Sequence, residues 1–196
     1  GLIDAVAEML KVKIMTRSGN FNKEFLEHDR FIVNGKKKEF IIAFEHETPM
    51  DSPITISLDD IREIQMAKGA FYSGARLLLN HLNEKYDKNF EIEQIYLAGA
   101  FGNYINKENA RFIGMIPDIE LEKIYQIGNA AGIGAQYCLI NRDYRDKAKE
   151  LLGKIDYVEI AVEDKFQREY AEAMYFPHMN LDLFPNLTVY KNIQKR

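Results

Sequence analysis

The sequence predicts an α/β fold. Short apolar runs typical of strands alternate with longer segments in which apolar residues recur every three or four positions, and no unit repeats at a fixed spacing. The 196 residues are 46% hydrophobic and 29% charged, a composition that favours a folded core over disorder. We expect one domain without a flexible linker.

The first part of the chain predicts a helix and then a small β-hairpin. Apolar residues with helical spacing indicate a helix over residues 2–11. Further on, Asn34-Gly35 lies between two apolar runs and supplies the positive φ angles of a tight turn. With a short strand expected at 54–56, residues 17–56 form a hairpin and loop insertion.

A long helix follows, and its start has a clear signal. Ser57 with Asp60 three residues later forms an acidic variant of the capping box. We expect the apolar residues that recur along this helix to form its buried face: Ile61, Ile64, Ala67, Phe71, Ala75, Leu78 and Leu82.

The remaining segments complete a core over residues 57–175. The patterns predict strands at 94–98 and 157–162 and helices at 106–113, 120–140, 143–152 and 164–175. The uncharged stretch 124–141 contains polar residues and glycines, so we interpret it as a buried helix and not a membrane span. The apolar tail, 176–196, either packs onto the domain or docks a partner.

Composition excludes several classes of function. The net charge of −4 argues against a nucleic-acid-binding protein. One cysteine, Cys138, cannot form an internal disulfide or hold an iron–sulfur cluster, and it suits a reducing cytoplasm. No metal site is predicted, because the histidines lack ligand spacing: His28, His46, His81 and His178. The chain opens without Met and in helical periodicity, so we expect a fragment of a longer protein.

Two groups of residues are candidates for ligand binding. The first is the turn Gly99-Ala100-Phe101-Gly102 after an apolar strand, because glycines let the backbone approach a ligand; a tight strand-to-helix turn is the alternative. The second is a stripe on the long helix, where Lys68 could reach a ribose or phosphate oxygen; a solvated lysine beside an incidental glycine is the alternative. The stripe consists of Gln65, Lys68, Gly69 and Tyr72.

Taken together, these segments closely resemble the C-terminal half of the reductive activators of corrinoid proteins. Those proteins are ATP-dependent activases of the sugar kinase, heat-shock chaperone and actin superfamily. The resemblance covers nearly the whole chain, and it is carried by residues 65–70, 95–105, 113–118 and 128–135, together with the opening segment 1–6.

The resemblance implies a ribonuclease H-like (actin-like ATPase) lobe, with a mixed sheet flanked by helices and a small inserted hairpin. It implies that ATP is bound by two groups, the adenosine turn Gly99, Ala100, Phe101, Gly102 and Asn103, and the adenine and ribose flank Gln65, Lys68 and Gly69. The small-residue segment 128–135 matches the helix with which the two halves pack. Here the turn reads Ala-Gly-Ala-Phe-Gly in place of the usual Gly-Gly pair.

The implied function is the adenosine-side lobe of an activase that uses ATP and magnesium to return cob(II)amide proteins to cob(I)amide for methyl transfer. Its partners are a corrinoid protein or corrinoid methyltransferase system and the upstream half of its own polypeptide. An iron–sulfur cluster would lie in another domain. No phosphate loop is found in the sequence, so no catalytic residue is assigned, and the chain alone is not expected to hydrolyse ATP.

Three other functions stay open. The chain could be a non-hydrolysing domain that forms a homodimer or docks a corrinoid protein. It could belong to an activator of the hydroxyacyl-CoA dehydratase type, although those proteins place cluster cysteines near this region and this chain has none. It could also be half of a sugar or acid kinase, which would require an Asp general base that the sequence does not reveal.

Overall fold

A computed structural model describes residues 1–35, 37–160 and 165–187, without the side chain of Phe101. The helices are α1 (Leu2–Lys11), α2 (Leu58–Tyr86), α3 (Gly99–Tyr104), α4 (Lys107–Phe112), α5 (Ala130–Ile140), α6 (Arg142–Leu152) and α7 (Phe166–Ala173). The strands are β1 (Phe31–Asn34), β2 (Lys37–Ala43), β3 (Ile54–Ser57), β4 (Ile95–Ala98) and β5 (Ile124–Gly128). Short 3-10 turns occur at Lys23–Phe25, Glu45–Glu47, Leu121–Lys123 and Leu181–Leu183.

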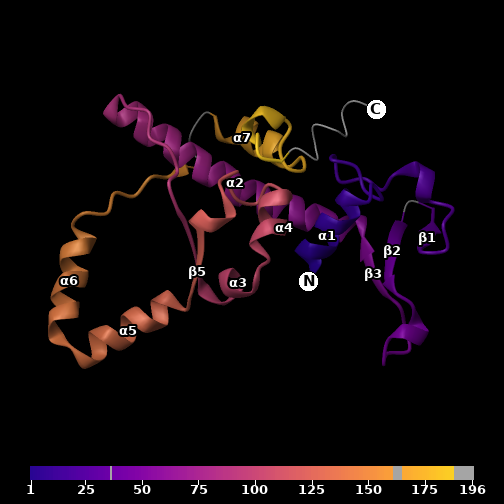
Figure 1. Ribbon diagram of the computed structural model, residues 1–196, viewed down its shortest axis with the longest axis horizontal. Helices are drawn as coiled ribbons and strands as arrows, with labels where there is room; N and C mark the ends of the chain where they lie inside the picture. Colours follow the sequence, from indigo (N-terminus) through magenta and orange to yellow (C-terminus); the bar gives the residue numbers. More distant parts are fainter. Residues whose placement is uncertain (36, 161–164, 188–196) are drawn as a thin grey trace.

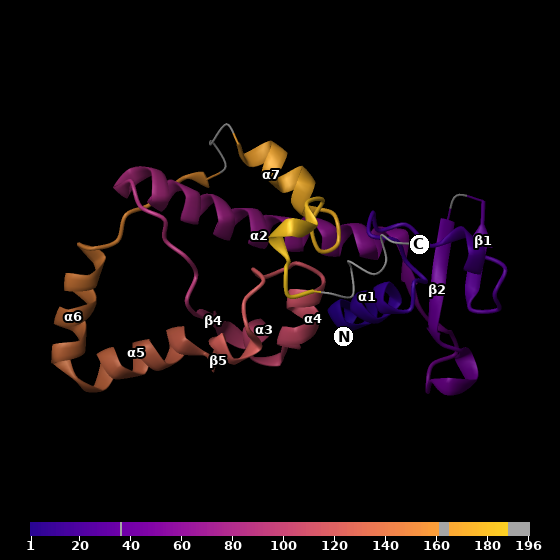
Figure 2. The same cartoon turned by 45° about the horizontal axis from the view of Figure 1, so that its top comes forward.

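The long helix α2 is the axis of the molecule (Figure 1). The sheet β1–β3 lies at its N-terminal end, and α7 lies along one of its sides. The pair β4–β5 and helix α3 lie on the opposite side, and α5 and α6 extend from them as an outlying arm (Figure 2). The fold is therefore α/β, with helices around two small sheets, as the sequence predicts.

The N-terminal elements match the predicted ones. Helix α1 buries its apolar side in the main core and packs beside α4. The hairpin turns at Asn34-Gly35, where Gly35 has a φ of +62°, and β1, β2 and β3 form an antiparallel sheet in chain order. A positive φ is the conformation that glycine adopts at no steric cost, which explains why this dipeptide fixes the turn.

Helix α2 begins as predicted but buries a different face. The Ser57 hydroxyl accepts from the backbone N–H of Asp60, whose carboxylate accepts from the backbone N–H of Ser57. The prediction of the buried face was wrong beyond Ile64, because α7 and the segment after it cover the polar side of the helix. The buried residues are Ile61, Ile64, Gln65, Lys68, Gly69, Tyr72, Ser73 and Leu77, whereas Ala67, Phe71, Leu78 and Leu82 are exposed.

The prediction of one helix over 120–140 was also wrong. Residues Ile124–Gly128 form strand β5, which pairs in parallel with β4, and only the second half of the segment is helical. Gly128 has a φ of +63° and ends the strand before α5 begins. The two strands pair Ile95 with Ile124 at one end and Ala98 with Gly128 at the other.

The arm of α5 and α6 has no core of its own. Both helices are fully described, and neither contains a buried residue, so the expectation of a buried helix in 124–141 was wrong. Residues 157–160 are not a strand, and the rest of the strand predicted at 157–162 lies outside the described residues. Across the described parts of the chain, no helix combines the length and apolarity needed to cross a membrane.

The C-terminal segment packs onto the domain. Helix α7 lies against α2, and residues 174–187 then return across the core, where Phe176 and Phe184 are buried. This outcome favours the first of the two expectations for the apolar tail. Residues 188–196 lie outside the described part.

Candidate functional site

The predicted turn forms the start of helix α3. Gly99 is half-buried with a φ of +86°, and a Cβ built on it would meet no atom within 4 Å, so the glycine is required by its conformation and not by crowding. Gly102 is different. A Cβ there would lie 2.9 Å from the carbonyl carbon of Leu97, so only glycine lets α3 fold back this closely on β4. Ala100 and Asn103 are exposed.

Gln126 of strand β5 holds the end of α3. Its Nε2 donates to the carbonyl oxygens of Gly102 at 2.8 Å, Asn103 at 3.3 Å and Ile105 at 2.8 Å. A side chain from the neighbouring strand therefore satisfies carbonyls that the short helix leaves without partners. Sequence reasoning did not single out Gln126, whose polar side chain in an apolar run was the available signal.

A pocket of about 760 Å³ opens beside this turn, between α2, α3 and the start of α1. Ala100 and Tyr104 line it from α3, and Ala67 and Phe71 line it from α2. The remaining lining residues are Gly1, Leu2, Ile3, Asp4, Ile64, Ile105, Asn106 and Met115. The face of α2 that was predicted to be buried is thus the face that looks toward the turn.

The predicted ligand stripe on α2 faces the other way, toward α7. Gly69 packs there so closely that an added Cβ would lie 3.3 Å from the Tyr170 ring. Gln65 donates from Nε2 to the carbonyl oxygens of Ser18 at 3.2 Å and Met174 at 2.8 Å. The alternative of a solvated lysine was wrong, because the side chain of Lys68 is 0% exposed.

The side chain of Lys68 is buried against two main-chain carbonyl oxygens. Its Nζ donates to the carbonyls of Tyr175 at 2.5 Å and Pro177 at 2.6 Å, and it lies 5.5 Å from the centre of the Phe176 ring. Burial lowers the pKa of Lys68 well below its ordinary value, and the charge of Arg17 lowers it further. The two carbonyl dipoles and the ring face offset part of this cost of burial.

Arg17 completes the attachment of the segment 174–179, which we call the strap. Its guanidinium donates to the carbonyl oxygens of Phe176 at 3.0 Å, His178 at 2.6 Å and Met179 at 3.2 Å. Together with Gln65 and Lys68, it supplies a side-chain donor to each of six consecutive carbonyls. No sequence pattern had indicated this role for Arg17.

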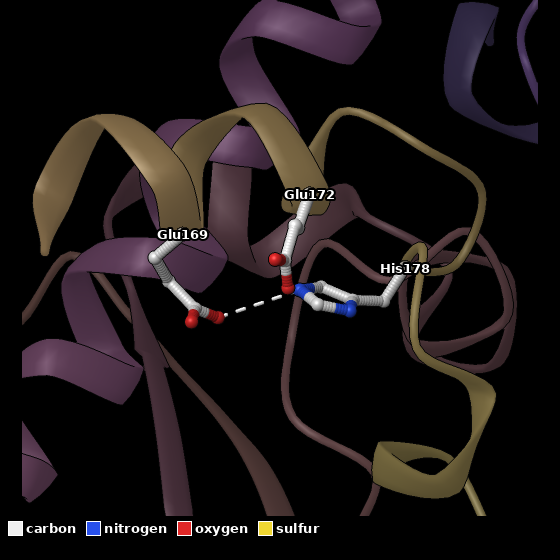
Figure 3. Close-up of side chains that lie close together, drawn as sticks. All are labelled: Glu169, Glu172 and His178. Carbon is white, nitrogen blue, oxygen red and sulfur yellow. Dashed lines mark ion pairs between the residues drawn. The ribbon is translucent and has the colours of Figure 1, made fainter.

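A cluster of Glu169, Glu172 and His178 lies where α7 meets the strap (Figure 3). One potential ligand atom from each residue lies within 4.8 Å of the others. His178 is 0% exposed, and its Nε2 lies 3.4 Å from Oε1 of Glu169. Burial raises the pKa of Glu169, but contacts with His178 and Arg76 outweigh this effect and lower it.

The hydrogen bonds of the cluster argue against a metal site. Nδ1 of His178 accepts from the backbone N–H of Asn180 at 3.0 Å, so the proton of the neutral ring lies on Nε2, the atom that faces the carboxylates. Arg76 lies 2.9 Å from Glu169 and supplies the positive charge that a cation would bring. We assign the cluster to the attachment of the strap.

Residues 1–188 match the family described as the C-terminal domain of RACo, the ASKHA domain. The chain belongs to this family. A solved structure described as a reductive activator for corrinoid, iron–sulfur protein matches 95% of the chain with a TM-score of 0.84 and 32% identity. The chain covers 29% of that protein.

Two relatives of this ASKHA domain are described as a corrinoid activation enzyme and as a reductase of a corrinoid protein. The corrinoid activation enzyme RamQ of Eubacterium limosum is 36% identical over 177 residues, which are 87% of this chain and 29% of RamQ. The [Co(II) methylated amine-specific corrinoid protein] reductase of Methanosarcina barkeri is 29% identical over 119 residues, which are 60% of this chain and 21% of the reductase. The chain therefore spans less than a third of the length of these relatives. The family expected from the sequence is confirmed.

Proposed function

We propose that this ASKHA domain is the adenosine-side lobe of an ATP-dependent activase that reduces cob(II)amide in a corrinoid protein to cob(I)amide, the form that accepts methyl groups. The observation that carries the proposal is the match of nearly the whole chain to domains of corrinoid activators. A corrinoid protein or corrinoid methyltransferase system is the partner in this proposal.

The turn at Gly99 fits the contact with ATP and magnesium that the proposal requires. Gly99 leaves its backbone open, and Ala100 leads directly into the pocket between α2 and α3. Gly102 and Gln126 fix the shape of the turn from behind. We propose residues 99–103 as the nucleotide contact. The resemblance also predicts a contact through Gln65, Lys68 and Gly69. In this structure the strap covers these residues, so such a contact would require the strap to move.

A second half of the polypeptide would complete the sheet. Within the described residues, β4 pairs only with β5, so the other edge of β4 has no strand beside it. Parallel sheets are found almost only where several strands are covered by helices on both faces. We propose that the upstream half of the longer protein supplies the next strand and the phosphate-binding groups that this chain lacks.

The electron donor must lie outside this chain. A single cysteine cannot ligate an iron–sulfur cluster, so the cluster is proposed for another domain. A reduced thiol and a low-potential electron carrier both suit the cytoplasm.

The test combines the complete polypeptide that carries this domain with a corrinoid protein and a low-potential reductant. The formation of cob(I)amide in the corrinoid protein is followed by visible absorption. Reduction should depend on ATP and magnesium. Gly99→Ala should slow it at limiting ATP, and Gly35→Ala is the matched control because Gly35 also has a positive φ and open surroundings. Equal rates with and without ATP would contradict the proposal.

A second candidate is a docking or dimerisation domain that does not hydrolyse ATP. It is favoured by the α5–α6 arm, where Leu139, Ile140 and Leu152 are at least 70% exposed. In that case, removal of the arm would abolish association with the corrinoid protein or with a second copy. The intact protein would already show no affinity for nucleotides.

A further inference from the structure

We propose that a small pocket at the hairpin end of the domain docks the corrinoid protein, by taking up an apolar side chain that lies next to a carboxylate on the surface of that protein. This inference rests on the proposed function, which names the corrinoid protein as the partner, and it adds the place of contact. The pocket has a volume of about 330 Å³, and it is lined by Val12, Ile14, Phe25, His28, Arg30, Phe31 and Phe40.

Most of the pocket wall is apolar. Ile14 comes shortly after the end of α1, and Phe25 belongs to the 3-10 turn that follows. Phe31 and Phe40 face each other across the hairpin, with ring centres 5.2 Å apart in an edge-to-face arrangement. A volume of about 330 Å³ is at the lower end of the range of ligand sites, so it suits one anchoring side chain of a protein partner.

The apolar wall continues onto the surface of the domain. Val12, which lines the pocket, is 56% exposed. Val33 is 45% exposed, and it lies two residues after Phe31 on β1. Because residues two apart on a strand share a face, Val33 lies on the side of the sheet that carries the pocket. Apolar surface of this kind, bordered by polar residues, marks a site of interaction with another protein.

Arg30 brings a fixed guanidinium to the pocket. Its Nη1 donates to the carbonyl oxygens of Ile41 at 3.1 Å and Ile42 at 3.0 Å, and its Cζ lies 4.7 Å from the centre of the Phe44 ring. Among the residues that the structure describes, none accepts a hydrogen bond from its Nε or Nη2. The edge formed by these two nitrogens is the fork that binds a carboxylate through two parallel hydrogen bonds.

His28 adds a second donor. Its Nδ1 accepts from the backbone N–H of Arg30 at 3.2 Å, so the proton of the neutral ring lies on Nε2. Lys38, which pairs with Val33 across the hairpin, adds a positive charge on the same face. Glu27 and Asp29 are exposed nearby in the chain, but the described lining of the pocket contains no carboxylate. A carboxylate on the partner is therefore the group that complements this rim.

The structure disfavours two other occupants. In a symmetric dimer each copy would present the same patch to the other, so donors would meet a patch lined by the same donors. The upstream half of the polypeptide is proposed to lie beside β4, whereas the sheet β1–β3 lies at the N-terminal end of α2, apart from the β4–β5 pair (Figures 1 and 2). A separate protein is the occupant that fits, and the proposed function supplies the corrinoid protein.

The experiment measures, by calorimetry, the binding of a corrinoid protein in the cob(II)amide state to the complete polypeptide that carries this domain. Arg30→Met should raise the dissociation constant about tenfold, because it removes the fork. Arg30→Lys should recover only part of the affinity, since it restores the charge without the fork. Arg168→Met is the matched control, because Arg168 is an exposed arginine of α7, and its loss should change the constant by less than about twofold.

Val12→Asp tests the apolar part of the pocket without removing the hydrogen bonds of Arg30. An acidic side chain there would repel the partner's carboxylate and meet its apolar anchor, so the dissociation constant should again rise about tenfold. Met50→Asp is the matched control, because Met50 is 50% exposed, follows β2 in the same part of the domain and does not line the pocket. Melting temperatures establish that each variant is folded.

Catalysis gives an independent readout. In the ATP-dependent reduction, Arg30→Met and Val12→Asp should raise the concentration of corrinoid protein that gives the half-maximal rate. The ATP concentration that gives the half-maximal rate should stay the same, since this pocket shares no described lining residue with the pocket beside α3. A merely structural role of the two residues would not separate the two substrates in this way.

The outcomes distinguish the inference from the proposed function. Unchanged affinity for the corrinoid protein in folded Arg30→Met and Val12→Asp proteins would overturn the inference, and so would an equal loss of affinity with Met50→Asp. A change of oligomeric state in Val12→Asp, with unchanged affinity for the corrinoid protein, would overturn it in favour of a second copy. Equal reduction with and without ATP, by a protein whose affinity for the corrinoid protein depends on Arg30 and Val12, would overturn the proposed function alone.

Discussion

Lys68 on α2 donates a hydrogen bond to the carbonyl oxygen of Pro177 at 2.6 Å, across 109 positions of the chain. This contact and its neighbours make the strap part of the core. They also reverse the expected role of Lys68, because a fully buried lysine contributes to stability in a way that an exposed one does not.

Lys68→Met should destabilise the protein. The substitution keeps the bulk of the side chain but leaves the carbonyls of Tyr175 and Pro177 buried without a donor, which costs about 1–3 kcal/mol. Urea unfolding measures the free energy, and Lys149→Met is the control, because Lys149 is exposed on α6 and its loss should cost less than about 0.5 kcal/mol. Equal stability of the two variants would show that the hydrogen bonds of Lys68 do not hold the strap.

Lys68 should make stability rise with pH over the range below its ordinary pKa of 10.5. The pKa of Lys68 is lowered in the folded protein, so in this range the residue binds more protons in the unfolded chain than in the folded one, and its contribution to the free energy of unfolding increases with pH. Lys68→Met should reduce this slope. The window ends near pH 10, because burial raises the pKa of Tyr72 and its titration acts in the opposite direction. A slope unchanged by the substitution would contradict the assignment.

Gly114→Ala should be among the most damaging single changes in the chain. Gly114 has a φ of +75°, and a Cβ there would lie only 2.0 Å from the carbonyl oxygen of Pro177, so the strap would have to move. Gly128→Ala separates the two effects, since Gly128 has a φ of +63° but open space around it. We expect a cost of about 1–2 kcal/mol for Gly128→Ala and a clearly larger cost for Gly114→Ala, measured by thermal unfolding.

Zinc should not stabilise the protein through the cluster of Glu169, Glu172 and His178. The Nε2 proton of His178 and the Arg76 guanidinium occupy the positions that a cation would need. Melting temperatures of the wild type and of His178→Gln, with and without zinc, provide the measurement. A rise on adding zinc that disappears in His178→Gln would overturn the interpretation.

The sequence was informative where the signal is local. Ser57 and Asp60 define the start of α2, and Asn34-Gly35 defines the hairpin, because caps and tight turns are made by neighbouring residues. Strand β5 was missed for the opposite reason. The strand ends at Gly128 and only Asn129 separates it from α5, and the partner that makes it a strand, β4, lies about thirty residues earlier.

The candidate site was predictable only in part. The glycines of the turn were found because their chemistry is intrinsic to the backbone. The orientation of α2 was not found, since both of its sides have helical periodicity and the more polar one is buried. Gln65 and Lys68 are buried because the carbonyls of the strap satisfy them, and those carbonyls carry no signal in the side-chain pattern.

The way the strap is held has a consequence for how this region can drift during evolution. The donors Arg17, Gln65 and Lys68 bind main-chain oxygens, which every amino acid possesses. Side chains of the strap that lie near the surface, such as Tyr175 and Met179, are thus free to vary, while the three donors are not. Saturation mutagenesis should show tolerance at Tyr175 and Met179, and little tolerance at the buried Phe176, Pro177 and His178 or at the three distant donors.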